Sequence, residues 1–476
     1  MQLSRGVCWE SIAKMAHFDP VQLAAWCRGM WQGQPPQFIA GITQDSRSVH
    51  PGDLYVALCG ERLDGHQFVS EARQRSAGAA LVQAEFATAT RDEFPLLVVE
   101  DTLQALTELA RGHRSRCKAC MVGVTGSVGK TSVKEMVADV LSHLGRVTRT
   151  HGNWNNHIGL PLSMLRMEPT DHYGVFEVGM NHPGELAPLC ELLRPDVGVL
   201  TPIGPVHIEN FDSVADIARE KATLLQTLTE SGQAILSLDD PWFELLRERV
   251  GSRCIVISME RSEADYYGEW HPGNGHLLHV RERATGIEHR YPMPLPGRYV
   301  ADNALRAIAV GREMGLSPDI IGHAIAAYQP LSMRWQVEDL DGVRVVNDAY
   351  NANPISMRSA IEALQESYPH DRLWLVVGGM FELGQIEPQE HAELGYYITQ
   401  FRWAGVVTVG GLGRQIAAGI AEAGTASFGV VSVPDPQAAA DELMHHLQPG
   451  DTVLLKASRG EKLEHIVEHL RNREMA

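Results

Sequence analysis

Short apolar runs, set between polar segments that contain Gly and Pro, recur through the middle of the chain. They fall at residues 121–124, 147–149, 175–178, 197–200, 234–238 and 254–257. Such runs are typical of buried strands, and helical patterns lie between several of them. This alternation predicts a mostly parallel, doubly wound sheet, whose ligands would gather at the carboxyl ends of its strands.

The run at 121–124 leads into the clearest helical pattern. A glycine-rich turn at 126–129 is followed by apolar residues at helical spacing, which are Val133, Met136, Val137, Val140, Leu141 and Leu144. We expect this helix to end at Gly145, because glycine is favoured just past a helix C-terminus.

Similar patterns flank this central region. Residues 1–115 combine short strands with turns, and the basic stretch 111–119 is interpreted as a linker. A stiff loop is expected at 291–297, then a helix, then a second boundary near 328–334. Further strands are expected at 343–346, 373–377, 406–409, 429–433 and 452–455. The prediction is an α/β fold of three domains, with bounds 1–115, 116–330 and 331–476.

The composition narrows the class of partner. The 476 residues carry a formal net charge of -18, which argues against non-specific binding to nucleic acid or to an anionic membrane. No stretch approaches 18 uninterrupted apolar residues, so we expect no membrane insertion. The N-terminus lacks the layout of a signal peptide, which favours a cytoplasmic protein.

The number and spacing of the cysteines also favour a cytoplasmic protein. The seven cysteines are Cys8, Cys27, Cys59, Cys117, Cys120, Cys190 and Cys254, an odd and scattered set that indicates free thiols. Cys117 and Cys120 form a CxxC pair near His113, but a second pair that would complete a zinc site is absent from the sequence.

The glycine turn carries the chemistry of phosphate binding. In Thr125-Gly-Ser-Val-Gly-Lys-Thr131, backbone N–H groups and a helix N-terminus would face the phosphates of a nucleotide. Lys130 would reach the β- and γ-phosphates, and the Thr131 hydroxyl would bind Mg²⁺. The loop is a short form, with Val124 where the general pattern has glycine. The alternative is an ordinary tight turn between a strand and a helix.

Four polar clusters accompany the loop. They are Gly152-Asn-Trp-Asn-Asn156, Glu177 with His207, Asp348-Ala-Tyr-Asn-Ala-Asn-Pro354, and Lys221. Glu177 and His207 follow predicted strands and could complete a metal shell near Thr131. Taken singly, these clusters also fit turn caps, a surface-loop histidine and a solvated helix lysine.

Together these residues resemble the Mur ligases, ATP-dependent amide-forming enzymes of peptidoglycan synthesis. The resemblance runs from about residue 42 to the C-terminus. Its specific pieces are Thr125-Gly-x-x-Gly-Lys-Thr131, Gly152-Asn-x-Asn-Asn156, Asn347-Asp-Ala-Tyr-Asn-Ala-Asn-Pro354, Phe381-Glu-Leu-Gly384 and Lys456-x-Ser-Arg459. The chain is most similar to the member that joins D-Ala-D-Ala to UDP-MurNAc-tripeptide.

The resemblance implies a domain for the UDP-sugar peptide, a central P-loop ATPase domain and a C-terminal Rossmann-like domain that closes over the site. ATP would convert a carboxylate to an acyl phosphate, which the dipeptide amine attacks. Implied catalytic residues are Lys130, His207 and a carbamoylated Lys221. Mg²⁺ would be held by Thr131, Glu177, His207 and Lys221.

The nucleotide would be bound by Thr125, Gly126, Ser127, Val128, Gly129, Lys130, Thr131, Ser132, Asn303, Arg334, Asp348 and Asn351. Substrate contacts are expected from Ser46, Arg47, Asn153, Asn155 and Asn156, and we expect a monomer. Taken alone, small polar residues on loops such as Ser46 and Arg47 belong to turns more often than to a ligand site.

Two positions depart from the family pattern. Gly378-Gly-Met380 stands where Gly-Asp-Met is usual, and Lys456-Ala-Ser458 where Lys-Gly-Ser is usual. The alternatives that remain are another Mur-type ligase that adds the third peptide residue, and a P-loop NTPase without ligase activity. A non-catalytic relative would be expected to lose Lys130, Glu177 or His207, and all three are present.

Overall fold

The computed structural model describes residues 18–60, 63–89, 93–250, 253–273 and 275–473. Its strands form three sheets that follow one another along the chain, with five, nine and six strands. Most neighbouring strands are parallel. The predicted α/β class with three units is confirmed.

The N-terminal sheet has the strand order β1-β5-β4-β3-β2. Its strands are β1 (Met30–Gln32), β2 (Ile42–Thr43), β3 (Leu54–Val56), β4 (Ala79–Gln83) and β5 (Leu96–Val99). Only β1, at the edge, runs antiparallel to its neighbour. The helices are α1 (Pro20–Cys27), α2 (Val69–Gln74) and α3 (Ala84–Ala89), with the 3-10 turn η2 (Ser46–Ser48).

The central sheet has the order β14-β13-β12-β11-β10-β9-β6-β8-β7. Its strands are β6 (Cys120–Thr125), β7 (Val147–Arg149), β8 (Tyr173–Glu177), β9 (Val197–Leu200), β10 (Gln233–Ser237), β11 (Arg253–Ser258), β12 (Tyr266–His271), β13 (Leu277–Glu282) and β14 (Glu288–Pro292). The six strands predicted from the apolar runs, β6 to β11, are all parallel to their neighbours. Strands β6, β8, β9 and β10 are almost entirely buried, so they have the apolar runs expected of a covered parallel sheet, whereas β7 at the edge is half-buried.

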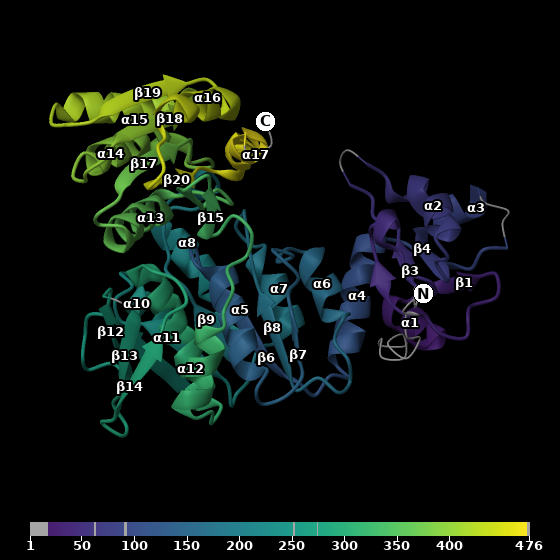
Figure 1. Cartoon of the computed structure of the whole chain (residues 1–476). Coiled ribbons are helices and arrows are strands. Elements are labelled where there is room, and N and C mark those ends of the chain that lie inside the picture. Colours follow the sequence, from purple (N-terminus) through teal and green to yellow (C-terminus); the bar gives the residue numbers. More distant parts are fainter. Residues whose placement is uncertain (1–17, 61–62, 90–92, 251–252, 274, 474–476) are drawn as a thin grey trace, which may run out of the picture.

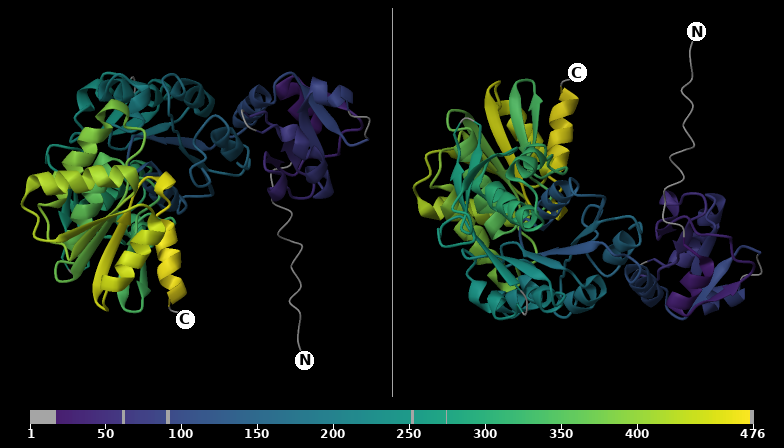
Figure 2. Two further views of the ribbon diagram at one scale, coloured as in Figure 1. Left: turned by 90° about the horizontal axis from the view of Figure 1, so that it is seen from above. Right: turned by 90° about the horizontal axis from the view of Figure 1, so that it is seen from below.

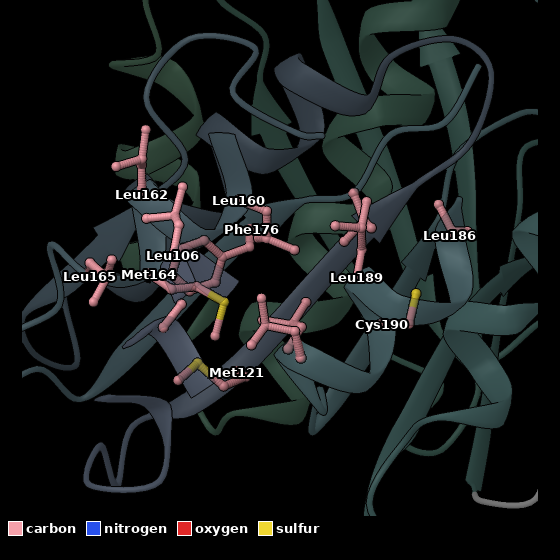
Figure 3. Packing of buried hydrophobic residues seen from close by; sticks show 14 of the residues in the cluster. Leu106, Met121, Leu160, Leu162, Met164, Leu165, Phe176, Leu186, Leu189 and Cys190 are labelled. Atoms are coloured by element: carbon pink, nitrogen blue, oxygen red, sulfur yellow. The ribbon is translucent and has the colours of Figure 1, made fainter. Parts of the chain in front are cut away.

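Helices cover both faces of this sheet. They are α5 (Lys130–Leu141), α6 (Gly159–Met164), α7 (Leu186–Leu193), α8 (Val214–Lys221), α9 (Thr223–Gln226), α10 (Phe243–Arg247), α11 (Arg298–Glu313) and α12 (Pro318–Ala326). One core contains α5 and α11, and the other contains α6 and α7. Figure 3 shows Leu106 from α4 (Thr102–Arg114) packed with Met164 of α6 and Phe176 of β8.

The C-terminal sheet has the order β15-β16-β20-β17-β18-β19, in which only β15 is antiparallel. Its strands are β15 (Gln336–Leu340), β16 (Val343–Asn347), β17 (Arg372–Val377), β18 (Gly405–Val409), β19 (Gly429–Val433) and β20 (Asp451–Lys456). Its helices are α13 (Pro354–Ser367), α14 (Glu387–Ile398), α15 (Gly410–Ala423), α16 (Pro436–His446) and α17 (Glu464–Arg473).

The three units are arranged unevenly in space (Figure 1). The C-terminal unit sits on the central one, whereas the N-terminal unit stands to one side and away from the C-terminal unit in all three views (Figures 1 and 2). No helix among the described residues is long and apolar enough to cross a membrane.

Several local predictions were wrong. Residues 111–114 of the expected linker form the last turn of α4, whose buried face joins the N-terminal and central cores. The helix after the glycine turn ends at Leu141, before Leu144 and Gly145, and residues 142–144 form a turn. Tyr291 and Pro292 of the expected loop belong to β14. The antiparallel strands β12 to β15 were not predicted from the sequence.

Candidate active site

The candidate site lies at the carboxyl ends of four adjacent strands. In the central sheet β10, β9, β6 and β8 are neighbours, so the loops that follow them meet at one edge. A cavity of about 850 Å³ lies there, and the C-terminal unit forms part of its wall. Its lining includes these predicted site residues: Ser127, Val128, Gly129, Lys130, Thr131, Ser132, Asn153, Asn155, Asn156, Glu177, His207, Asn303, Arg334, Asp348 and Asn351.

The glycine turn is fixed by its neighbours on both sides. Thr125, the last residue of β6, donates its hydroxyl proton to the Val178 carbonyl over 2.7 Å. Gly129 has a φ of +86° and caps α5, and a Cβ there would collide with the Asn303 side chain. Residue 129 therefore needs glycine both for its left-handed backbone and for the close approach of α11.

Lys130 opens α5 and turns its side chain back over the loop. Its Nζ donates to the Gly126 carbonyl over 3.0 Å. Burial lowers the pKa of the ammonium, while the charge of Glu177 opposes that shift. The loop thus concentrates a buried cation and a helix N-terminus at one end of the cavity, which suits a polyanion.

Glu177 is a buried carboxylate at the end of β8 and is only 2% exposed. The Thr131 hydroxyl donates to its Oε2 over 2.8 Å, and the Asn155 amide donates to its Oε1 over 2.7 Å. A hydroxyl and a carboxylate so placed are hard oxygen donors of the kind that Mg²⁺ prefers. These residues therefore fit a magnesium ion.

The lysine predicted from its pattern as solvated is buried instead. Lys221, at the end of α8, is 3% exposed, so the solvated-helix alternative is wrong. Burial and the nearby charge of Lys130 hold its pKa well below the ordinary value of 10.5, against the opposing charges of Glu220 and Glu177. Lys221 is not among the residues that line the cavity. The burial of its side chain results from the packing around α8 and could not be predicted from its position in the helical pattern.

His207 lies in the loop between β9 and the 3-10 turn η4 (Ile208–Asn210). Its backbone is left-handed, with a φ of +58°, and its side chain is 19% exposed. The alternative of a surface-loop histidine is therefore wrong for this residue, which lines the cavity beside the C-terminal unit.

The C-terminal unit contributes a guanidinium and a carboxylate. Arg334 donates from Nη2 to the Thr131 Oγ1 over 3.1 Å and stacks over the Tyr350 ring, 4.1 Å from its centroid. Asp348 accepts from Lys456 Nζ over 2.6 Å. Asn351 also lines the cavity, next to these groups.

Hydrogen bonds from buried and neighbouring side chains fix the asparagine cluster, residues 152–156. Lys134 of α5 is fully buried, and its Nζ donates to the Thr150 and Gly152 carbonyls over 2.7 and 3.1 Å. Asn156 caps the turn that leads into α6, since its side-chain oxygen accepts from the Gly159 N–H over 2.9 Å. The turn-cap alternative thus describes Asn156, while Asn155 is bonded to Glu177.

Ser46 and Arg47 lie in η2 of the N-terminal unit and do not line the cavity. The Ser46 hydroxyl donates to Glu71 over 2.7 Å, and Arg47 pairs with Asp45 over 2.8 Å. The structure therefore does not bring these two predicted substrate contacts together with the phosphate loop.

Two acidic residues of the cavity wall were missed. Asp239 and Asp240 follow β10, and Asp240 accepts from the Ile203 N–H over 3.2 Å. Burial raises the pKa of Asp240. The rule that ligands gather at strand ends, applied to the apolar run at 234–238, could have found them.

The cysteines behave as predicted where they are described. Cys27, Cys59, Cys117, Cys120, Cys190 and Cys254 are free, and Cys8 lies outside the described residues. Among the described residues, the one metal-type cluster is Cys59, Asp64 and His66. His66 Nε2 accepts from the Gln83 N–H, so Nδ1 carries the proton and donates to Asp64 over 2.7 Å. That proton occupies the position that a metal would need.

The two departures from the family pattern lie side by side. A Cβ on Gly379 would lie 3.0 Å from Glu461 Oε1, and one on Gly378 would lie 2.9 Å from the Ala457 Cβ. Gly379 also donates its N–H to Glu461 Oε1 over 3.2 Å. The carboxylate of Glu461 thus occupies the space beside residue 379.

Most of the chain matches known protein families in sequence. Three family models match in sequence order: Mur ligase family, catalytic domain, at residues 38–114; Mur ligase middle domain, at 124–311; and Mur ligase, glutamate ligase domain, at 333–459. Two relatives, from Bacillus subtilis (strain 168) and Escherichia coli (strain K12), are each 33% identical, over 440 and 443 residues. Both are named UDP-N-acetylmuramoyl-tripeptide–D-alanyl-D-alanine ligase. The alignments cover 91% and 90% of this chain and 93% of each relative.

Solved structures agree with the sequence comparison. A crystal structure of MurF from Acinetobacter baumannii has a TM-score of 0.86 at 27% identity and covers 96% of this chain and 99% of that one. MurF from Thermotoga maritima in complex with ADP has a TM-score of 0.79 at 27% identity, covering 92% and 98%.

Proposed function

The chain belongs to the Mur ligase family, and we propose that within it this protein joins D-Ala-D-Ala to UDP-MurNAc-tripeptide with ATP. The product is the UDP-MurNAc-pentapeptide used in peptidoglycan synthesis. The observation that carries the proposal is the bond from Thr131 to Glu177 beside Lys130, inside a cavity that the C-terminal unit helps to enclose. The two relatives of that name align over nearly their whole length.

In the first step a carboxylate oxygen of the tripeptide attacks the γ-phosphorus of ATP. An acyl phosphate forms, and ADP leaves. A phosphoryl group in transfer carries spread negative charge, so catalysis depends on positioning and charge neutralisation. Lys130 and Arg334 are the cations suited to this task, since both belong to the cavity wall and Arg334 already contacts the phosphate loop.

Thr131, Glu177, His207 and Lys221 would hold Mg²⁺, with Lys221 as a carbamate. When bound, Mg²⁺ would supply positive charge that neutralises the phosphates of the nucleotide. For Lys221, a buried amine with a lowered pKa has more of the neutral form that reacts with CO₂. The carbamate then turns a cation into an oxygen donor, which explains how a lysine could serve beside Glu177.

In the second step the amine of D-Ala-D-Ala attacks the acyl carbon. The amide bond forms, phosphate leaves, and the amine loses a proton. The acyl phosphate must be kept from water, and the packing of the C-terminal unit on the central unit supports that role. Asn153, Asn155 and Asn156 line the cavity and are proposed to position the tripeptide end.

The remaining assignments follow from this scheme. We propose domains at 1–115, 116–330 and 331–476, of which the first, with Ser46 and Arg47, binds the UDP-sugar part. Asn303, Asp348 and Asn351 would contact the nucleoside, because they lie on the cavity wall around the loop. The protein is proposed to act as a cytoplasmic monomer on small-molecule substrates.

A coupled assay of ADP release tests the proposed function. ATP is supplied with UDP-MurNAc-tripeptide alone, with D-Ala-D-Ala alone, and with both. Sustained ADP release that needs both substrates, together with the pentapeptide product by mass spectrometry, is expected. Release that is independent of both would favour the alternative of a P-loop NTPase, and a requirement for a single amino acid would favour another Mur-type ligase.

A further inference from the structure

Two residues from different units meet at the edge of the cavity. His207 Nδ1 of the central unit lies 2.5 Å from Glu382 Oε2 of the C-terminal unit. At this distance the ring nitrogen lies against the carboxylate, although the geometry of a hydrogen bond is not met. His207 Nδ1 is buried against this carboxylate.

The loop that carries Glu382 is docked on the loop that carries His207. The Glu209 N–H donates to the Glu382 carbonyl over 3.3 Å. Gly384, at the start of the 3-10 turn η5 (Gly384–Ile386), lies so close that a Cβ there would be 3.0 Å from the Glu209 Cα. Ile208 packs against the core of the C-terminal unit. The contact of His207 with Glu382 is therefore one part of a larger contact between the two units.

Both partners have an unusual backbone. His207 and Glu382 have φ values of +58° and +62°, a region that residues other than glycine rarely adopt. Such conformations persist where surrounding structure holds them, and they concentrate at functional sites. Here the two left-handed residues point their side chains at each other across the boundary.

An imidazole can offer a metal only one of its nitrogens at a time. With Nδ1 facing Glu382, the proton belongs on Nδ1, and the lone pair of Nε2 remains for a ligand in the cavity. A carboxylate on the far nitrogen of a metal-binding histidine fixes its tautomer and ring orientation and raises its basicity.

We propose that Glu382 is a positioning residue that orients His207 for metal binding, so that the metal site of the central unit is complete only when the C-terminal unit is docked. This inference rests on the proposed metal role of His207. Metal binding and docking then favour each other, since a coupling free energy acts equally in both directions.

The test is the binding of Mn²⁺, as a paramagnetic substitute for Mg²⁺, to the full chain with ADP, followed by electron paramagnetic resonance. Glu382→Asn removes the charge and shortens the side chain, while asparagine tolerates the left-handed backbone. We expect the Kd for Mn²⁺ to rise about 10-fold, as for other carboxylates that support a metal-bound histidine. Glu442→Asn is the matched control, because it removes the carboxylate beside another histidine, His446, outside the cavity wall, and its Kd should stay within about twofold of the parent.

A double-mutant cycle separates positioning from simple charge. If Glu382 acts through His207, the variant His207→Ala with Glu382→Asn should bind Mn²⁺ no more weakly than His207→Ala alone. Additive losses would overturn the inference, as would an unchanged Kd in Glu382→Asn while His207→Ala is weakened. An unchanged Kd in His207→Ala would instead contradict the metal role in the proposed function. Thermal unfolding of each variant verifies that the fold is kept.

Discussion

Arg334 and Thr131 lie 203 positions apart in the sequence, yet the guanidinium of one donates a 3.1 Å hydrogen bond to the hydroxyl of the other. The same hydroxyl donates to Glu177, so one threonine links the phosphate loop, the end of a neighbouring strand and the C-terminal unit. Further contacts fix the docking, including the bond from Trp270 Nε1 to Glu366 over 2.8 Å. Residues of both the central and the C-terminal unit therefore form the site.

Arg334→Lys should impair the reaction without harming the fold. Lysine keeps the charge but loses the planar group that stacks on Tyr350 and reaches Thr131. We expect kcat/KM for ATP to fall roughly 100-fold, the lower end of the range for a lost charge-stabilising contact, because lysine keeps the charge. Arg344→Lys is the control, since Arg344 also stacks on a tyrosine, Tyr368, outside the cavity wall. Equal kcat/KM values in both variants would contradict the role of Arg334.

Glu177→Gln should raise the Mg²⁺ concentration that gives half-maximal activity. The substitution keeps the size of the side chain but removes the charge that a divalent cation needs. We expect a shift of about 10-fold or more, comparable to the loss of a supporting metal contact. Glu191→Gln, on the exposed side of α7, serves as the control. Superimposable Mg²⁺ titrations of the parent and Glu177→Gln would show that Glu177 is not a ligand.

Much of this site follows from sequence pattern, and the reason is physical. The buried strands of a covered parallel sheet are continuous apolar runs, so β6 to β11 were recognisable, and the residues that follow them fall at one edge. Glu177 and His207 were found in this way. The carboxyl end of β10 obeys the same rule, and Asp239 and Asp240 were missed only because the rule was not applied there.

What could not be predicted depends on packing between distant segments. Lys221 has the helical position of a solvated residue, and only the fold around it makes it buried. The strands β12 to β14 alternate buried and exposed residues with many polar side chains, so their apolar signal is weak. Arg334, Asp348 and Asn351 reach the cavity from another unit, and only the family resemblance indicated that they would contact the nucleotide.

Lys221→Ala should be nearly inactive, and a small carboxylic acid such as formate should partly restore turnover. The proposed carbamate supplies oxygen donors to a hard cation, and the free acid can replace some of them. Lys118→Ala, at an exposed lysine, should retain activity and gain nothing from formate. Full activity of Lys221→Ala without added acid would rule the role out.

The pH dependence of the free energy of unfolding tests whether the pKa of Lys221 is lowered in the folded protein. Since burial and the charge of Lys130 lower its pKa, the unfolded chain holds this proton up to a higher pH than the folded protein. In that window the unfolded state binds more protons, so the free energy of unfolding rises with pH. In CO₂-free buffer, the parent should gain stability relative to Lys221→Met as the pH rises toward about 10, where a lysine of the unfolded chain loses its proton. A constant difference between the two proteins would contradict a lowered pKa.

The central claim is that a substrate carboxylate is activated by phosphoryl transfer at this site. The direct measurement uses UDP-MurNAc-tripeptide labelled with ¹⁸O in both oxygens of its reacting carboxylate, together with ATP and D-Ala-D-Ala. An acyl phosphate retains one carboxylate oxygen on phosphorus when the amine attacks carbon, so each released phosphate should carry one ¹⁸O atom. The variant Lys130→Ala, which lacks the charge over the phosphate loop, should release no labelled phosphate above background. Amide product formed with unlabelled phosphate would contradict the account.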